Sequence, residues 1–169
     1  AHDSAWRFRP PVKNDVTGYQ LHPMDLAINK VLALAGRDEA RDYLATLQIH
    51  RDVLPLGALC WAGAGKDPGF TPRSLLDLLQ RRGKYQPEEF ARLHLARPVD
   101  LVTLKKEWLG ALEDAAAFVN FAPPSEAGCL YYSKSGRKFV QPDLSGQRSA
   151  SVVPHYGRPG GILPRVFAE

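Results

Sequence analysis

Apolar residues in the middle of the chain recur every three or four positions, which is the period of an α-helix with one buried face. The clearest segment begins at Pro23, a residue suited to the first helical position, and carries Asp25 in its first turn. Gly36 predicts its end, and a second helix is expected from Asp38 through Ile49. The apolar face of the first helix comprises Leu26, Ala27, Val31, Leu34 and Ala35.

Four later segments carry the same pattern or clear helix-end signals. Thr71 and Pro72 form a cap and first turn for "TPRSLLDLLQRRGKY", which Gly83 ends. The longest helix is expected from Asp100 to Asn120. Two shorter segments, "PLGALCWAGAG" and "QPEEFARLHLA", complete the helical part.

Extended segments are expected at both ends of the chain. "AWRFRP" and "TGYQL" predict a strand pair, and "GCLYYSKSGRKFVQP" predicts a hairpin that turns at Ser135 and Gly136. Residues 143–169 are rich in Gly and Pro and predict an irregular wrap or a partly disordered tail. The predicted fold class is therefore mainly α: a strand pair in 1–21, a helical bundle in 22–122, and a hairpin with its tail in 123–169.

Composition narrows the class of protein. The 169 residues suit one domain, and 44% hydrophobic residues allow a real core. A net charge of +4 is compatible with partners that carry phosphate. Two distant cysteines favour a reducing cytoplasm over a disulfide framework. No apolar run approaches the roughly 20 residues of a membrane span, so no membrane association is expected.

Lys30 is the first candidate for chemistry because apolar residues surround it on the predicted helix. Arg37 and Arg41 follow seven and eleven positions later, intervals that return close to its azimuth on one helix. Although Gly36 interrupts that helix, a tight helix–turn–helix would still bring Lys30 near Asp42. A lysine held beside a carboxylate at an apolar wall binds phosphate well, and an internal salt bridge is the alternative.

The stretch "DLAINKVLALAGRDEARDYL" resembles the helical half of AbiEii-like nucleotidyltransferases, a group of abortive-infection toxins. The resemblance covers residues 21–47 and departs from the family pattern at Ala45, where a second Asp is usual. The matching residues are Asp25, Lys30, Ala33, Arg37, Arg41 and Asp42.

The resemblance implies catalytic roles for Lys30 and Asp42, and nucleotide binding by Lys30, Arg37 and Arg41. It also implies Mg²⁺ and a nucleoside triphosphate as cofactors, an RNA or protein acceptor, and an antitoxin partner. The Gly-Ser and D-x-D residues that hold metal in such enzymes do not occur in this sequence. We therefore expect a carboxy-terminal portion that begins with the last strands of a missing sheet. Alone it would be inactive and bind no cofactor.

Two alternatives to the enzyme portion remain open. Arg81, Arg82 and Lys84 form the densest basic cluster, which predicts either contact with a nucleic-acid backbone or a solvated helix end. A non-enzymatic nucleic-acid-binding module is therefore the first alternative. The second is an interaction protein that forms a homodimer through its amino-terminal strands, since a free strand pair is marginal in water.

Two weaker signals in the sequence predict no functional site. "AGAGKDPG" lacks the Gly and the Ser or Thr that a phosphate loop needs, so it predicts a Gly-rich loop between helices. No His and Cys residues have paired ligand spacing, and no metal site is predicted in this chain.

Overall fold

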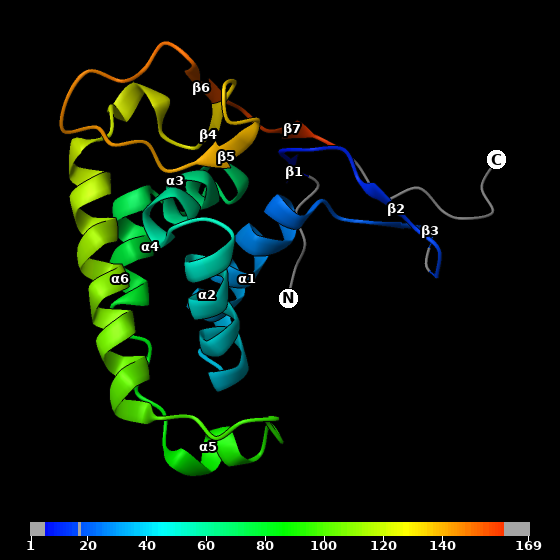
Figure 1. The fold of residues 1–169 in the computed structure, drawn as a ribbon, viewed down its shortest axis with the longest axis vertical. Helices are drawn as coiled ribbons and strands as arrows, with labels where there is room; N and C mark the ends of the chain where they lie inside the picture. The colour runs from blue at the N-terminus through cyan, green and yellow to red at the C-terminus, as the bar shows by residue number, and fades with distance from the viewer. Residues whose placement is uncertain (1–5, 17, 161–169) are drawn as a thin grey trace.

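The computed structural model describes residues 6–16 and 18–160, and within these ranges the chain is mainly α-helical, as predicted (Figure 1). The helices of the described ranges share one core, to which the short α5 contributes Phe90 from its place near the amino-terminal end of α6. The helices are α1 (Pro23–Arg37), α2 (Ala40–Asp52), α3 (Leu56–Lys66), α4 (Pro72–Leu79), α5 (Pro87–Ala91) and α6 (Leu101–Phe121).

The turn between α1 and α2 differs slightly from the prediction. The first helix continues past Gly36 to Arg37 and ends where Asp38 adopts the left-handed conformation, with φ 54°. Aspartate tolerates this conformation better than most residues, and its backbone N–H bonds back to the Leu34 carbonyl. At the other end of α1, the His22 ring accepts the Met24 N–H.

Helix α3 lies at the centre of the bundle. Leu56, Leu59 and Cys60 have no solvent exposure, and α6, α4 and α1 all pack against this helix. Gly65 lets the backbone near Gly128 approach so closely that a Cβ at position 65 would lie 2.2 Å from the Gly128 carbonyl oxygen. Burial raises the pKa of the Cys60 thiol to about 12, so this cysteine is an inert core residue.

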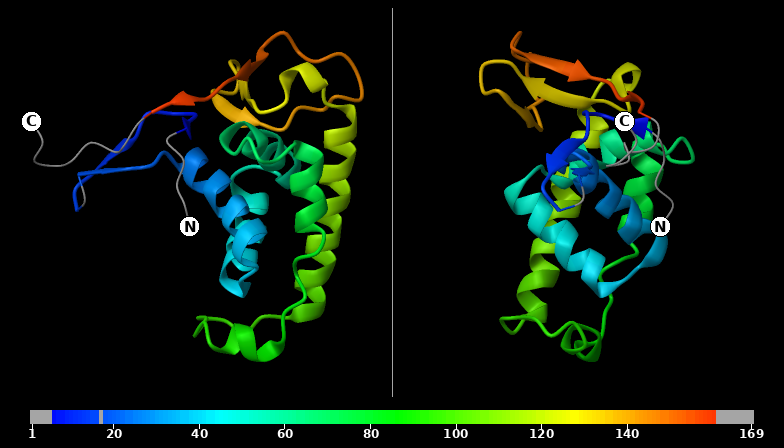
Figure 2. Two further views of the ribbon diagram at one scale, coloured as in Figure 1. Left: turned by 180° about the vertical axis from the view of Figure 1, so that it is seen from behind. Right: turned by 90° about the vertical axis from the view of Figure 1, so that its right-hand side faces the viewer.

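The amino-terminal strands pair differently from the prediction. β1 (Trp6–Arg7) pairs with β7 (Arg158–Pro159) near the other end of the chain, and β2 (Val12–Asn14) pairs with β3 (Gly18–Gln20). Pro10 and Pro11 separate β1 from β2, because proline cannot donate to a ladder. Figure 2 shows that the β2–β3 ribbon extends away from the helices.

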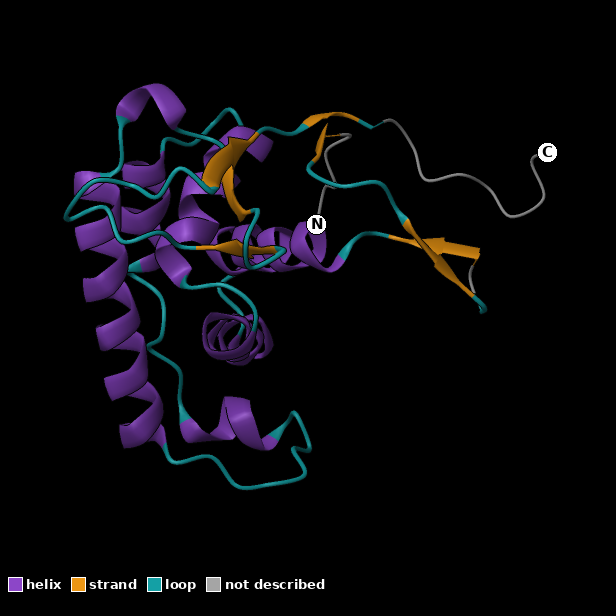
Figure 3. Cartoon of the chain, turned by 45° about the horizontal axis from the view of Figure 1, so that its top comes forward, coloured by secondary structure: helices purple, strands orange, loops and turns teal. Residues whose placement is uncertain are grey.

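The predicted hairpin is present as β4 (Leu130–Ser133) and β5 (Lys138–Val140), after a short 3₁₀ turn at Pro124–Glu126. The prediction of an irregular tail from residue 143 is wrong in part. β6 (Val152–His155) pairs with the free edge of β4, and β7 follows it. Its two valines favour extended backbone within the Gly- and Pro-rich segment. Residues 161–169 of the predicted tail lie outside the described part, as do 1–5 and 17. Figures 1 and 3 show β4, β5 and β6 on the part of the molecule that lies opposite α5, with β7 next to β1.

Candidate functional site

Three of the residues singled out in the sequence meet between α1 and α2. The Lys30 ammonium lies 3.4 Å from Oδ1 of Asp42. Arg37 donates from Nη2 to the same oxygen at 3.0 Å and from Nε to Oδ2 at 3.2 Å. The prediction that Asp42 faces inward, within reach of Lys30 or Arg37, is confirmed, although a catalytic role remains a prediction.

The local fold explains this arrangement. Lys30 and Arg37 lie two turns apart on one face of α1, because seven residues nearly complete two helical turns. The short link through Asp38 and Glu39 folds α2 back against α1, which brings the first turn of α2 to that face. Asp42 in this first turn also suits the positive end of the α2 dipole.

Burial differs sharply between the acid and its two bases. The Asp42 side chain has no exposure, whereas those of Lys30 and Arg37 are 36% and 38% exposed. The hydrogen bonds to Asp42 use one of the three donors of Lys30 and two of the five of Arg37. The cluster carries two positive charges and one negative, and its partly exposed donors can meet an anion.

Arg41 does not join this cluster, although the resemblance implied a nucleotide-binding role for it. Its side chain is 69% exposed and lies 3.5 Å from Glu39. One turn after Asp42, Ala45 is half-buried and places no carboxylate at this position. The structure therefore brings together Lys30, Arg37 and Asp42.

A second charged centre was not predicted from the sequence. Asp25 and Lys66 form a buried ion pair at 3.4 Å, with side-chain exposures of 0% and 1%. Asp25 also accepts the backbone N–H groups of Phe8 and Arg9 at 3.0 and 3.1 Å. Lys66 was expected in a Gly-rich loop, but it is the last residue of α3. This centre ties the amino-terminal segment to α1 and α3.

The structure separates the members of the basic cluster at 81–84. Arg82 donates to the carbonyl oxygens of Leu34 and Ala35 at 3.2 and 2.5 Å, so its guanidinium caps the carboxyl end of α1. Arg81 and Lys84 are exposed. Their contact with nucleic acid remains a prediction, whereas Arg82 is engaged within the protein.

Other classes of site find less support in the described ranges. No group of three His, Cys, Asp or Glu side chains there is placed to hold a metal ion. None of the helices observed there has the length and apolar character needed to cross a bilayer. Comparison of the chain with protein-family models, curated proteins and solved structures finds no match.

Proposed function

We propose that this chain is the helical portion of a nucleotidyltransferase-like protein and that it positions the phosphates of a nucleoside triphosphate. The observation that carries the proposal is the contrast between the buried Asp42 carboxylate and the partly exposed cations of Lys30 and Arg37 that share it. The bonds to Asp42 leave two donors of Lys30 and three of Arg37 unused by the carboxylate, and an anion at the surface can accept from them.

The three residues have distinct roles in this proposal. Lys30 and Arg37 contact phosphate oxygens of the nucleotide, Lys30 as a compact charge and Arg37 through its planar fork. Asp42 is a positioning residue: it fixes both side chains so that less conformational freedom is lost when the anion binds. In nucleotidyl transfer an acceptor hydroxyl attacks the α-phosphorus, and the bond to the leaving pyrophosphate breaks. Cations held in place stabilise the charge that develops on these oxygens.

The chain needs a partner portion for this chemistry. The described residues do not fit a magnesium site, so no step is assigned to a metal on them. The proposal places the carboxylates that hold Mg²⁺ outside this chain, with an RNA or a protein as acceptor and an antitoxin as a further partner. It also places the protein in the cytoplasm, where nucleoside triphosphates are present and the two buried cysteines remain as free thiols.

The test is pyrophosphate release by a polypeptide that carries both this chain and the proposed metal-binding portion. Asp42→Asn keeps the shape of the side chain and removes its charge. We expect its activity to fall at least tenfold, while its unfolding free energy falls by only about 1–2 kcal/mol, because both cations are exposed enough to hydrate.

Arg41→Gln is the matched control, since it removes an exposed charge from the neighbouring position of α2. It should keep its activity and stability. Failure of the wild-type polypeptide to release pyrophosphate with any of the four ribonucleotides would refute the proposal. So would an Asp42→Asn variant that is fully active or one that loses stability and activity in equal measure.

A further inference from the structure

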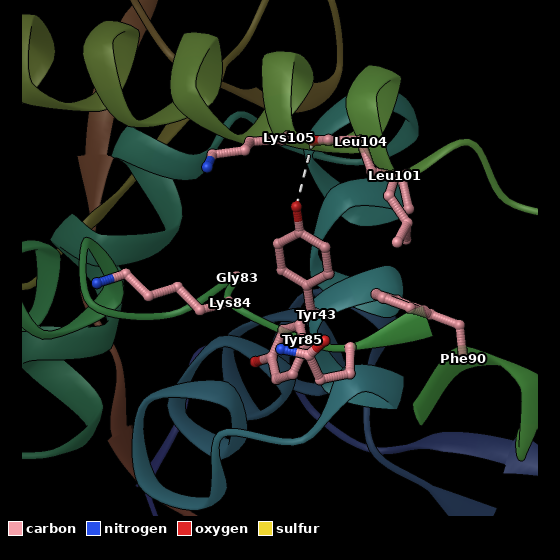
Figure 4. Close-up of a pocket in the computed structure, with 9 residues that line it drawn as sticks. Tyr43, Gly83, Lys84, Tyr85, Phe90, Leu101, Leu104 and Lys105 are labelled. Atoms are coloured by element: carbon pink, nitrogen blue, oxygen red, sulfur yellow. Dashed lines mark hydrogen bonds between the residues drawn. The ribbon is translucent and has the colours of Figure 1, made fainter. Parts of the chain in front are cut away.

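A separate pocket lies between α2, α6 and the loop that precedes α5. Its volume is about 220 Å³, and its apolar walls come from Tyr43, Phe90, Leu104 and the ring of Tyr85 (Figure 4). Lys84 and Lys105 line it as well, one from the loop and one from α6. In Figure 4 the two lysine side chains extend to the same side of the Tyr43 ring.

Tight local packing fixes the walls of this pocket. Gly83 has φ +93°, and a Cβ there would lie 2.9 Å from the Trp108 ring and 3.1 Å from the Tyr43 ring. Tyr43 donates to the Leu104 carbonyl at 3.2 Å, and Tyr85 donates to Asp38 at 2.6 Å. The two tyrosine rings lie 5.1 Å apart at their centroids. The flat walls are thus held in place before any ligand arrives.

The charge in the pocket has one sign. None of the residues that line it is acidic, and within the described ranges neither Lys84 nor Lys105 forms an ion pair. Glu107, the acid next along α6, is engaged by Arg51 at 3.2 Å. Burial and the Glu107 charge raise the pKa of Tyr43 to about 12, and burial, with the hydrogen bond to Asp38, also raises that of Tyr85. Both phenols therefore stay neutral at physiological pH.

We propose that this pocket binds a small organic anion with one flat ring, whose carboxylate or phosphate lies between Lys84 and Lys105. The ring packs against Tyr43 and Phe90 and removes its own apolar surface from water. The anion supplies the charge partner that neither lysine has among the residues lining the pocket. The volume suits a single ring with its acidic group, which limits the ligand class by size.

Four probes test charge and shape separately on the full chain. Benzoate and phenyl phosphate carry the ring with an anion, benzamide carries the ring without charge, and acetate carries the anion without a ring. Titrations are followed by two-dimensional NMR at the amides of Gly83, Lys84 and Phe90. We expect saturable shifts with benzoate and phenyl phosphate, and at least fivefold weaker binding of benzamide and acetate. Tighter binding of phenyl phosphate than benzoate would assign the natural ligand to phosphates.

Variants locate the site. Lys84→Gln and Lys105→Gln should each weaken benzoate binding roughly two- to fivefold, and their combination should weaken it further. Lys106→Gln, the neighbouring exposed lysine on α6, is the matched control and should change nothing. Leu101→Trp fills the pocket and should abolish binding without removing a charge. The proposal is overturned if benzamide binds as well as benzoate, if Lys106→Gln weakens binding as much as Lys105→Gln, or if no probe shifts these amides.

Discussion

Replacement of Asp25 by Asn tests the buried centre that joins the amino-terminal segment to the helices. The change is nearly isosteric, but it removes the carboxylate charge that pairs with Lys66, and both side chains are almost fully buried. Asparagine also has one acceptor oxygen, whereas the carboxylate uses Oδ1 for Phe8 and Lys66 and Oδ2 for Arg9.

The expected loss follows from that geometry. Removing one partner of a buried pair weakens the compensation of the other charge and costs about 3–5 kcal/mol of unfolding free energy. For a domain of this size each kcal/mol lowers the melting temperature by about 2–4 °C, so the variant should melt roughly 6–20 °C below the wild type. Chemical and thermal unfolding followed by circular dichroism measure both quantities.

Two further variants decide whether charge is the cause. Lys66→Met combined with Asp25→Asn removes both charges, so the double variant should recover at least about 1 kcal/mol relative to the sum of the single changes. Glu39→Gln removes an exposed carboxylate and should stay within about 0.5 kcal/mol of the wild type. A cost of less than about 1 kcal/mol for Asp25→Asn would mean that water reaches the pair and that Asp25 and Lys66 are not buried in solution.

Three other predictions concern separate parts of the chain. Arg148 donates to the Glu126 carboxylate and holds its pKa below the usual range. This ion pair therefore stabilises the fold above about pH 4.5, and the stabilisation is lost as the pH falls through the lowered pKa of Glu126. Glu126→Gln should therefore lower the unfolding free energy by about 1.5–3 kcal/mol at pH 7 in chemical unfolding. If the variant is less stable than the wild type by the same amount at pH 2, the ion pair is not the cause. Gly83→Ala should cost at least about 1–3 kcal/mol in the same assay, because its Cβ meets Trp108 at a positive φ; a neutral effect would refute the packing. The chain should form a dimer through the β2–β3 ribbon, and Tyr19→Lys should shift light scattering towards the monomer; an unchanged dimer would place the interface elsewhere.

The helices were predictable because their signals are local. The apolar period and the caps located α1, α2, α4 and α6 within a few residues, whereas α3 continues into the predicted loop and α5 ends early at Ala91. The spacing of Lys30, Arg37 and Asp42 predicted their meeting across one turn. The pairing of strands from opposite ends of the chain leaves no such local signal in the sequence. β1 pairs with β7 about 150 residues later, and two-residue strands carry too little pattern to select a partner.

The two unpredicted sites depend on tertiary contacts between residues that look ordinary in the sequence. Lys66 lies in a Gly-rich stretch whose composition predicts a loop, and its pairing with Asp25 depends on how α3 packs against α1. Lys84 and Lys105 lie 21 positions apart, and they share a pocket because Gly83 lets the loop approach α6. Long-range juxtapositions of this kind require the structure.

Calorimetric titration of a nucleoside triphosphate with Mg²⁺ tests the central claim most directly, in the polypeptide that joins this chain to the proposed metal-binding portion. Lys30→Ala removes a charge-assisted contact worth about 1.5–3 kcal/mol, so its dissociation constant should rise roughly 10- to 150-fold. Arg41→Ala, which lies outside the cluster, should bind like the wild type. Equal affinity of the wild type and Lys30→Ala would contradict the account and leave Lys30, Arg37 and Asp42 as an internal salt bridge.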